Sequence, residues 1–149
     1  MAVLGLHLQK GLLRYAVLDG TRAKPVLLSK DRLITPDPAQ VPALMDWYDT
    51  KFRQLLADHQ PSHVACRLTL EPSKEQLFYS EFPLGVLHLI AHQQGIPVSC
   101  LTAQSFTPSR LGLPRETNLN DQCDLMFGKN PPYWDKDQKY AVLVAWFEL

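Results

Sequence analysis

Residues 3–19 constrain the fold more than any other stretch, because their apolar side chains recur at the two-residue period of a β-strand. Three leucines occupy every second position of the first segment: Leu4, Leu6 and Leu8. A polar turn follows at residues 9–11, and residues 12–18 form a second apolar run. Two short runs around a tight turn predict a β-hairpin, with His7 as the polar side chain where the first strand ends.

The rest of the chain predicts helices that alternate with further strands. The expected elements are a strand at 25–34, a helix at 40–59, a strand at 63–70, a helix at 83–94, a strand at 96–101 and a helix at 135–147. Only a short helical piece is expected within residues 103–111. Residues 112–129 are rich in loop formers and are expected to form a loop.

This order of elements predicts an α/β fold in one domain that spans residues 1–149. Helical crossovers favour parallel pairing of the first, fourth and fifth strands through right-handed connections. The opening hairpin makes the second strand antiparallel to the first. We therefore expect a mixed, five-stranded sheet in the spatial order 3-2-1-4-5, with helices on both faces.

Composition limits the class of protein further. The chain has 149 residues and is 46% hydrophobic, which is enough for a substantial core. Its 15 Lys and Arg balance its 15 Asp and Glu, which counts against a strong grip on nucleic acid. No apolar run reaches the ~20 residues of a membrane span, and no signal-peptide pattern opens the chain. Three cysteines without paired spacing fit a reducing compartment, so we expect a cytoplasmic protein with no membrane contact.

The opening hairpin carries a motif that resembles a known family. In that family an apolar residue, a glycine and a second apolar residue precede an aspartate, where this chain reads Leu4-Gly5-Leu6-His7. The following strand ends similarly, as Tyr15-Ala16-Val17-Leu18-Asp19. Together with the order of elements, the motif resembles the RuvC and YqgF branch of the ribonuclease H-like superfamily, the relatives of Holliday junction resolvases.

The resemblance implies a site with two divalent metal ions, Mg²⁺ or Mn²⁺, held by carboxylates of the first strand, the fourth strand and the last helix. Carried over by position, these carboxylates fall on His7, on Arg67, and near Asp135 or Asp137. A guanidinium cannot ligate a metal ion. Glu71 can replace Arg67 only if its strand carries it toward His7. We therefore expect a catalytically degenerate member that needs no cofactor.

The favoured hypothesis is a non-enzymatic module that binds nucleic acid, DNA or RNA, weakly or that binds a protein. Its expected binding residues are His7, Gln9, Lys10 and Arg67. Donors such as an arginine and a histidine can hold a phosphate or a carboxylate without hydrolysing it. For Arg67 taken alone, the favoured role is a structural ion pair with Glu71, Asp135 or Asp137.

Two other classes of function stay open. The first is a divergent metal-dependent nuclease of the resolvase type, with Glu71, Asp135 and Asp137 as its catalytic residues and Mg²⁺ or Mn²⁺ as its cofactor. The second is a pure protein-interaction module, including a homodimer. Both the nucleic-acid binder and the nuclease predict an open cleft near His7 and Arg67, whereas the interaction module predicts a covered one.

Histidine and cysteine pairs offer weaker signals for metal binding. His88 and His92 stand four residues apart on one helix face, a spacing that can bind zinc, but no third ligand stands in sequence. Cys66 and Cys100 are expected in adjacent strands, as small buried side chains. Cys123 lies in a segment expected to be a polar loop, where its thiol would be exposed.

Aromatic residues flank the last helix. Tyr133 and Trp134 follow two prolines, and they either pack the loop onto the core or stack a base at the surface. The first of these roles is favoured. Trp146 and Phe147 are expected to be core contacts or part of a dimer patch.

Overall fold

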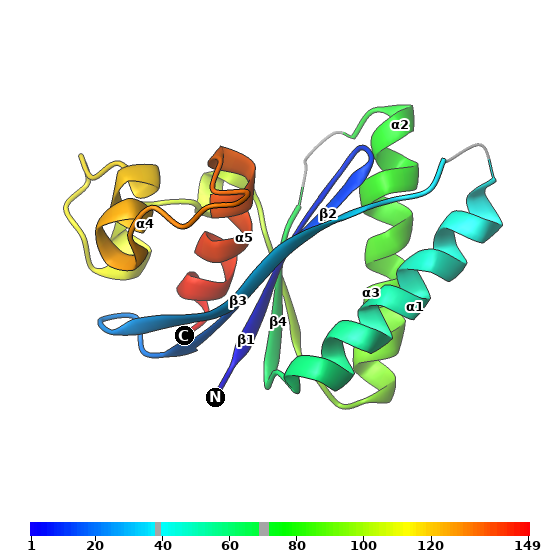
Figure 1. Cartoon of the computed structure of the whole chain (residues 1–149), viewed down its shortest axis with the longest axis horizontal. Helices are drawn as coiled ribbons and strands as arrows, with labels where there is room; N and C mark the ends of the chain where they lie inside the picture. The colour runs from blue at the N-terminus through cyan, green and yellow to red at the C-terminus, as the bar shows by residue number, and fades with distance from the viewer. Residues whose placement is uncertain (38–39, 69–71) are drawn as a thin grey trace.

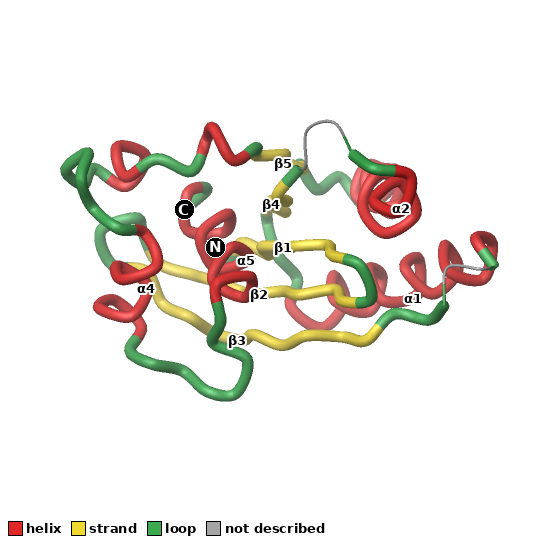
Figure 2. Tube along the Cα trace, turned by 90° about the horizontal axis from the view of Figure 1, so that it is seen from above, coloured by secondary structure: helices red, strands yellow, loops and turns green. Residues whose placement is uncertain are grey.

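A computed structural model describes residues 1–37, 40–68 and 72–149 of the chain. Its centre is a sheet of five strands in the order β3-β2-β1-β4-β5, which Figure 2 shows side by side. The strands are β1 (Val3–Gln9), β2 (Leu12–Gly20), β3 (Pro25–Ile34), β4 (His63–Arg67) and β5 (Val98–Leu101). β1 pairs antiparallel with β2 and parallel with β4, so the predicted mixed sheet and its strand order are confirmed.

Alternation along β1 divides the molecule into two layers, which lie on either side of the sheet in Figure 1. The leucines at positions 4, 6 and 8 face one layer, where α1 (Val41–His59) and α3 (Phe82–Gln93) complete an apolar core. Val3 faces the other layer, where α5 (Lys136–Phe147) packs on the sheet. His7 lies on the same side of β1 as Val3, so the pleat directs it toward α5.

Gly5 allows α5 to pack unusually close to β1. A Cβ atom at this position would overlap the carbonyl oxygen of Ala141 and crowd the Cβ atom of Ala145. Only glycine leaves room for the helix backbone at this point. The glycine of the opening motif therefore sets the distance between the first strand and the last helix.

The second crossover begins earlier than the sequence predicts. Helical structure starts in α2 (Lys74–Gln76), continues through a π-helical turn, η1 (Leu77–Glu81), and runs into α3. Ser73 caps this start: its hydroxyl accepts from the Gln76 N–H, while the Gln76 side chain accepts from the Ser73 N–H. This reciprocal capping box explains the nine-residue difference from the predicted start at residue 83.

The prediction of a loop over residues 112–129 is wrong, because α4 (Leu119–Phe127) lies within it. Asn118 caps this helix by accepting a hydrogen bond from the Asp121 N–H. Cys123 is fully buried on α4, and burial raises the pKa of its thiol to about 12. The expected exposed thiol is therefore also wrong, since the helix turns Cys123 into the layer of α5.

Other boundaries differ by a few residues. β4 ends at Arg67, and the remainder of its predicted range, at 69–70, lies outside the described residues. Residues 103–111 contain two short 3-10 turns, η2 (Ala103–Ser105) and η3 (Pro108–Leu111). Trp146 and Phe147 are buried core residues, as expected. Within the part of the chain that the structure describes, no helix combines the length and apolarity needed to cross a bilayer.

Candidate functional site: a cleft beside the first and fourth strands

A cleft of about 620 Å³ lies where β1 and β4 end and α5 begins. Its walls include the four residues that the sequence predicts for binding and one of the predicted acidic residues: His7, Gln9, Lys10, Arg67 and Asp137. β1 supplies His7 and Gln9, and β4 supplies Arg67 at its last position. Parallel strands bring their carboxyl ends to one edge of the sheet, which explains why residues sixty apart in sequence meet there.

His7 is a neutral histidine at the inner wall of the cleft. It is only 9% exposed, and its Nε2 atom lies 3.6 Å from Asp137 Oδ1. Burial, followed by the positive charge of Arg67, lowers the pKa of His7 to about 4. Its Nδ1 atom is buried and has no hydrogen-bond partner among the described residues. At neutral pH His7 therefore carries no charge and retains unused hydrogen-bonding capacity.

Arg67 is held over aromatic rings. Its guanidinium carbon lies 3.6 Å from the centre of the Tyr140 ring and 4.7 Å from that of Phe106. Burial by itself raises the pKa of Tyr140, but hydrogen bonds and charges from Arg67 and Lys136 outweigh this effect and lower it. Among residues 1–37, 40–68 and 72–149, no carboxylate lies within ion-pair distance of Arg67. The two ring contacts thus hold the guanidinium in place.

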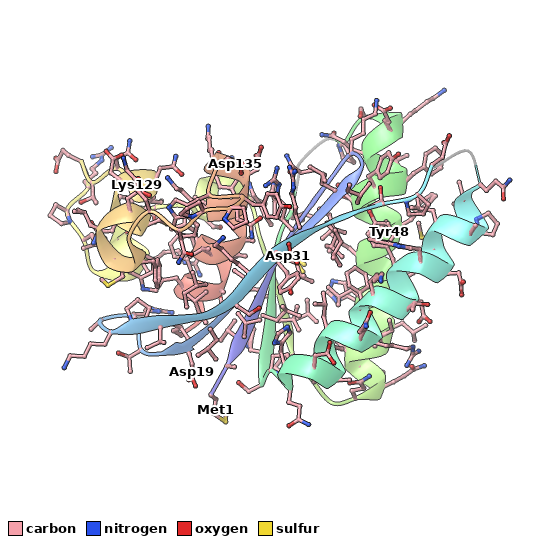
Figure 3. All side chains as sticks on the ribbon, in the orientation of Figure 1. Met1, Asp19, Asp31, Tyr48, Lys129 and Asp135 are labelled. Carbon is pink, nitrogen blue, oxygen red and sulfur yellow. The ribbon has the colours of Figure 1, made fainter. Side chains whose placement is uncertain are left out.

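Asp135 does not line the cleft; it lies at the start of α5 (Figure 3). Its carboxylate caps the helix by accepting from the Gln138 N–H at 2.9 Å. The same oxygen accepts from Arg14 Nη1 at 3.0 Å, and Arg14 Nε donates to Gln9 Oε1 at 2.7 Å. Asp135 therefore supports the cleft from behind rather than facing it.

The rest of the predicted acidic set is not assembled in the described cleft. Glu71 lies outside the described residues. Lys10 pairs with Glu75 across the cleft mouth, with 2.6 Å between Nζ and Oε1. Over the described residues, no group of three or more histidine, cysteine, aspartate or glutamate side chains is placed to hold a metal ion. His88 instead contacts Cys100, with 3.5 Å between Nε2 and Sγ.

Sequence reasoning missed two residues that shape this site, Arg14 and Tyr140. Arg14 interrupts the apolar run of β2 and is only 4% exposed, so a charged residue at an inward strand position was its available signal. It pairs in register with His7, on the same face of the sheet. Tyr140 lies one helical turn after Asp137, a spacing that places both on the cleft side of α5.

Comparison with known proteins supports the fold. No protein-family model matches the chain, and no curated protein sequence matches it. Among solved structures, Thermus thermophilus RuvC in complex with a Holliday junction substrate superposes with a TM-score of 0.78 at 18% identity, over 99% of this chain and 91% of that chain. The yeast mitochondrial Holliday junction resolvase superposes with a TM-score of 0.71 at 13% identity, over 97% of this chain and 76% of that chain.

A third structure, the fowlpox virus Holliday junction resolvase, gives a TM-score of 0.59 at 10% identity, over 97% of this chain and 94% of that chain. These similarities extend over nearly the whole length of the chain. Because the sequence identities are this low, the similarity is one of backbone fold alone. With the strand order described above, they show that the chain has a ribonuclease H-like fold similar to that of these resolvases.

Proposed function

We propose that this protein binds the phosphodiester backbone of DNA or RNA in the cleft without hydrolysing it. The observation that carries the proposal is Arg67, a guanidinium fixed over two aromatic rings in the wall of an open cleft. The similar structure of Thermus thermophilus RuvC is a complex with a Holliday junction substrate. A four-way junction is therefore the first nucleic acid to test.

The chemistry of the cleft suits an anion that accepts hydrogen bonds. A guanidinium presents several N–H donors in a planar fork that matches phosphate oxygens. Stacking on Tyr140 and Phe106 restricts the arginine side chain before any ligand arrives, which reduces the entropy lost on binding. Neutral His7 adds a polar group beside it. These features support recognition of a backbone phosphate.

The same donors do not fit two divalent metal ions. Mg²⁺ and Mn²⁺ prefer oxygen ligands, whereas the positions implied by the family carry a buried imidazole at His7 and a cation at Arg67. Asp137 supplies one carboxylate to the cleft, and Asp135 is engaged by its cap and by Arg14. This argues for a binder that works without a cofactor.

A divergent nuclease remains the second candidate, and one observation favours it. Asp137 faces the cleft with 41% of its side chain exposed, on the helix that carries the third carboxylate in the family. The pure protein-interaction module is less favoured, because none of the described residues covers the cleft.

Fluorescence anisotropy with labelled four-way junction, duplex and single-stranded DNA, in EDTA and across a salt series, tests the proposal. We expect salt-sensitive binding that weakens by about 10- to 100-fold in Arg67→Ala, the range for lost hydrogen bonds to a charged group. Arg53→Ala is the matched control, since Arg53 is an arginine on the exposed side of α1 paired with Asp49.

The outcomes separate the candidates. Binding that survives EDTA and is lost in Arg67→Ala supports the proposed binder. Cleavage that appears with Mn²⁺ and disappears in Asp137→Ala replaces it with the nuclease. Absence of binding at low salt rejects nucleic acid as the ligand and leaves a protein partner.

A further inference from the structure

The connector between α4 and α5 places one aromatic ring at the surface. Tyr133 is 40% exposed and has a φ of 61°, in the left-handed region that a tyrosine rarely adopts. Residues held in such conformations are found preferentially where a ligand is bound. The ring therefore has both an exposed surface and a backbone that fixes where it stands.

The neighbouring aromatic residue behaves differently. Trp134 donates from Nε1 to Asp124 Oδ1 at 2.6 Å, and the Nζ atoms of Lys30 and Lys139 each lie 5.7 Å from its ring centre. Trp134 thus packs the connector onto the body of the protein, which is the favoured role from the sequence. Tyr133 is more exposed than Trp134 and contacts a different cation.

A second arginine covers the Tyr133 ring. Arg32, on β3, places its guanidinium carbon 4.1 Å from the ring centre. No carboxylate of the described ranges lies within ion-pair distance of this guanidinium, and the neighbouring Asp31 accepts a hydrogen bond from the backbone N–H of Arg32. An arginine and an aromatic ring in contact form a surface on which a nucleobase can stack while the cation attracts its phosphate.

This surface and the cleft lie on the same face of the sheet, joined through neighbouring positions of β1, β2 and β3. Gln9 lines the cleft and accepts from Arg14, which pairs in register with Arg32 across β2 and β3. Arg32 then contacts Tyr133. β3 is three strands from β4, which carries Arg67, a separation of about 14 Å at the usual strand spacing. At about 3.4 Å per stacked nucleotide, this distance corresponds to roughly four nucleotides of one strand.

We propose that Tyr133 and Arg32 form a stacking platform for an unpaired nucleobase of the strand whose backbone is bound at Arg67. This inference rests on the proposed function and adds a preference to it: nucleic acid with single-stranded character is bound more tightly than blunt duplex. Sequence is not read at this platform, because every nucleobase presents a stacking face.

Oligonucleotides that carry 2-aminopurine at successive positions of a single-stranded overhang test the platform, because stacking quenches the fluorescence of this base. We expect quenching at one or two positions only, and tighter binding of the overhang probe than of the blunt duplex. In Tyr133→Leu, we expect affinity for the overhang to fall by about 5- to 100-fold, with no change for the duplex. Tyr133→Phe keeps the ring and is expected to retain both quenching and affinity.

Arg32→Gln is the second variant, and it guards against a folding defect in Tyr133→Leu. It is expected to lower overhang affinity while the duplex affinity stays near that of the native protein. If Arg67→Ala weakens binding but Tyr133→Leu and Arg32→Gln bind overhang and duplex like the native protein, the platform is rejected and the proposed function stands. If the native protein binds neither probe, both proposals fail.

Discussion

Two histidine–carboxylate pairs lie at opposite ends of the layer formed by β1, β4 and α5. At the cleft, His7 Nε2 is 3.6 Å from Asp137 Oδ1. At the other end, His63 Nε2 is 3.6 Å from Glu148 Oε2. The distances are the same, and in each pair one partner comes from a parallel strand and the other from α5 or the residue that follows it. Their surroundings differ.

The His63 pair belongs to a connected polar network. Ser99 lies 2.7 Å from His63 Nε2 and donates to Glu148 at 3.4 Å, while Arg110 lies 3.8 Å from the same carboxylate. The His7 pair leaves a buried nitrogen without a described partner and stands beside a cation with no described counter-ion. The contrast teaches that a histidine beside a carboxylate becomes a candidate binding site when its environment leaves donors and charge unsatisfied.

Replacing Gly5 is expected to disturb both histidine–carboxylate pairs at once, because Gly5 lies between them at the point where α5 packs on β1. In Gly5→Ala, the new methyl group would overlap the Ala141 carbonyl oxygen, so helix and strand must separate. We expect the free energy of unfolding to fall by about 3 kcal/mol or more, the upper range for overpacking. Urea denaturation followed by circular dichroism measures it.

Gly85→Ala is the matched control for this prediction. Gly85 lies in α3, and nothing within 4 Å would meet its Cβ atom. Alanine favours helix over glycine, so we expect stabilisation by about 0.5 to 1 kcal/mol. Equal effects of the two substitutions would show that the close contact at Gly5 is unimportant.

Acid sensitivity should be concentrated at the cleft pair. His7 has a pKa of about 4 in the folded protein, against the ordinary histidine value of 6.5 that it regains on unfolding, so between these values the unfolded chain binds more protons. The free energy of unfolding should therefore fall as the pH drops from about 6.5 to 4, by about 3 kcal/mol in total. Urea denaturation at a series of pH values measures this, and the free energy of unfolding should depend much less on pH in His7→Gln than in the native protein. Parallel curves for native protein and variant would contradict the prediction.

The sequence predicted the sheet because strand alternation and turn residues are local signals. The sequence of elements along the chain, together with the handedness of the crossovers, leads to the strand order 3-2-1-4-5 and places His7 beside Arg67 in the same cleft. α4 was missed because its only strong local signal is the cap at Asn118, within a stretch rich in loop formers. Its burial of Cys123 against α5 is a tertiary contact, which periodicity does not report.

The residues that line the cleft were easier to predict than the side chains that each of them contacts. Arg67 was expected to pair with a carboxylate if it was structural, yet in the described residues its contacts are two aromatic rings. Asp135 is a catalytic residue only in the divergent-nuclease alternative, and in the structure it pairs with Arg14 and does not line the cleft. One oxygen of Asp135 accepts from both the N-terminus of α5 and Arg14, and a contact between residues more than a hundred positions apart leaves no local signal in the sequence.

Asp135 is expected to support the cleft end of α5, so removing it tests whether the two ends are held independently. Asp135→Ala loses the helix cap and leaves Arg14, only 4% exposed, without its carboxylate. We expect a loss of about 2 kcal/mol in the free energy of unfolding. Asp135→Asn keeps the capping oxygen and should lose less. Hydrogen exchange should rise at the first turn of α5 and stay unchanged near Glu148; a uniform rise would mean that the ends are coupled.

The smallest effects are expected from neutralising each carboxylate of the two pairs, and they differ in kind. Glu148→Gln and Asp137→Asn should each change the free energy of unfolding by about 1 kcal/mol or less, because each amide keeps an oxygen that accepts hydrogen bonds and Asp137 faces an uncharged histidine. Removing the negative charge of Asp137 from the cleft should nevertheless tighten the binding of a phosphate backbone by up to about fivefold. Glu148→Gln should leave that binding unchanged, because Glu148 lies at the far end of the sheet. Anisotropy titrations of both variants with labelled DNA in EDTA measure these affinities. Weaker binding by Asp137→Asn would contradict the prediction, because it would mean that the Asp137 carboxylate contacts the ligand directly.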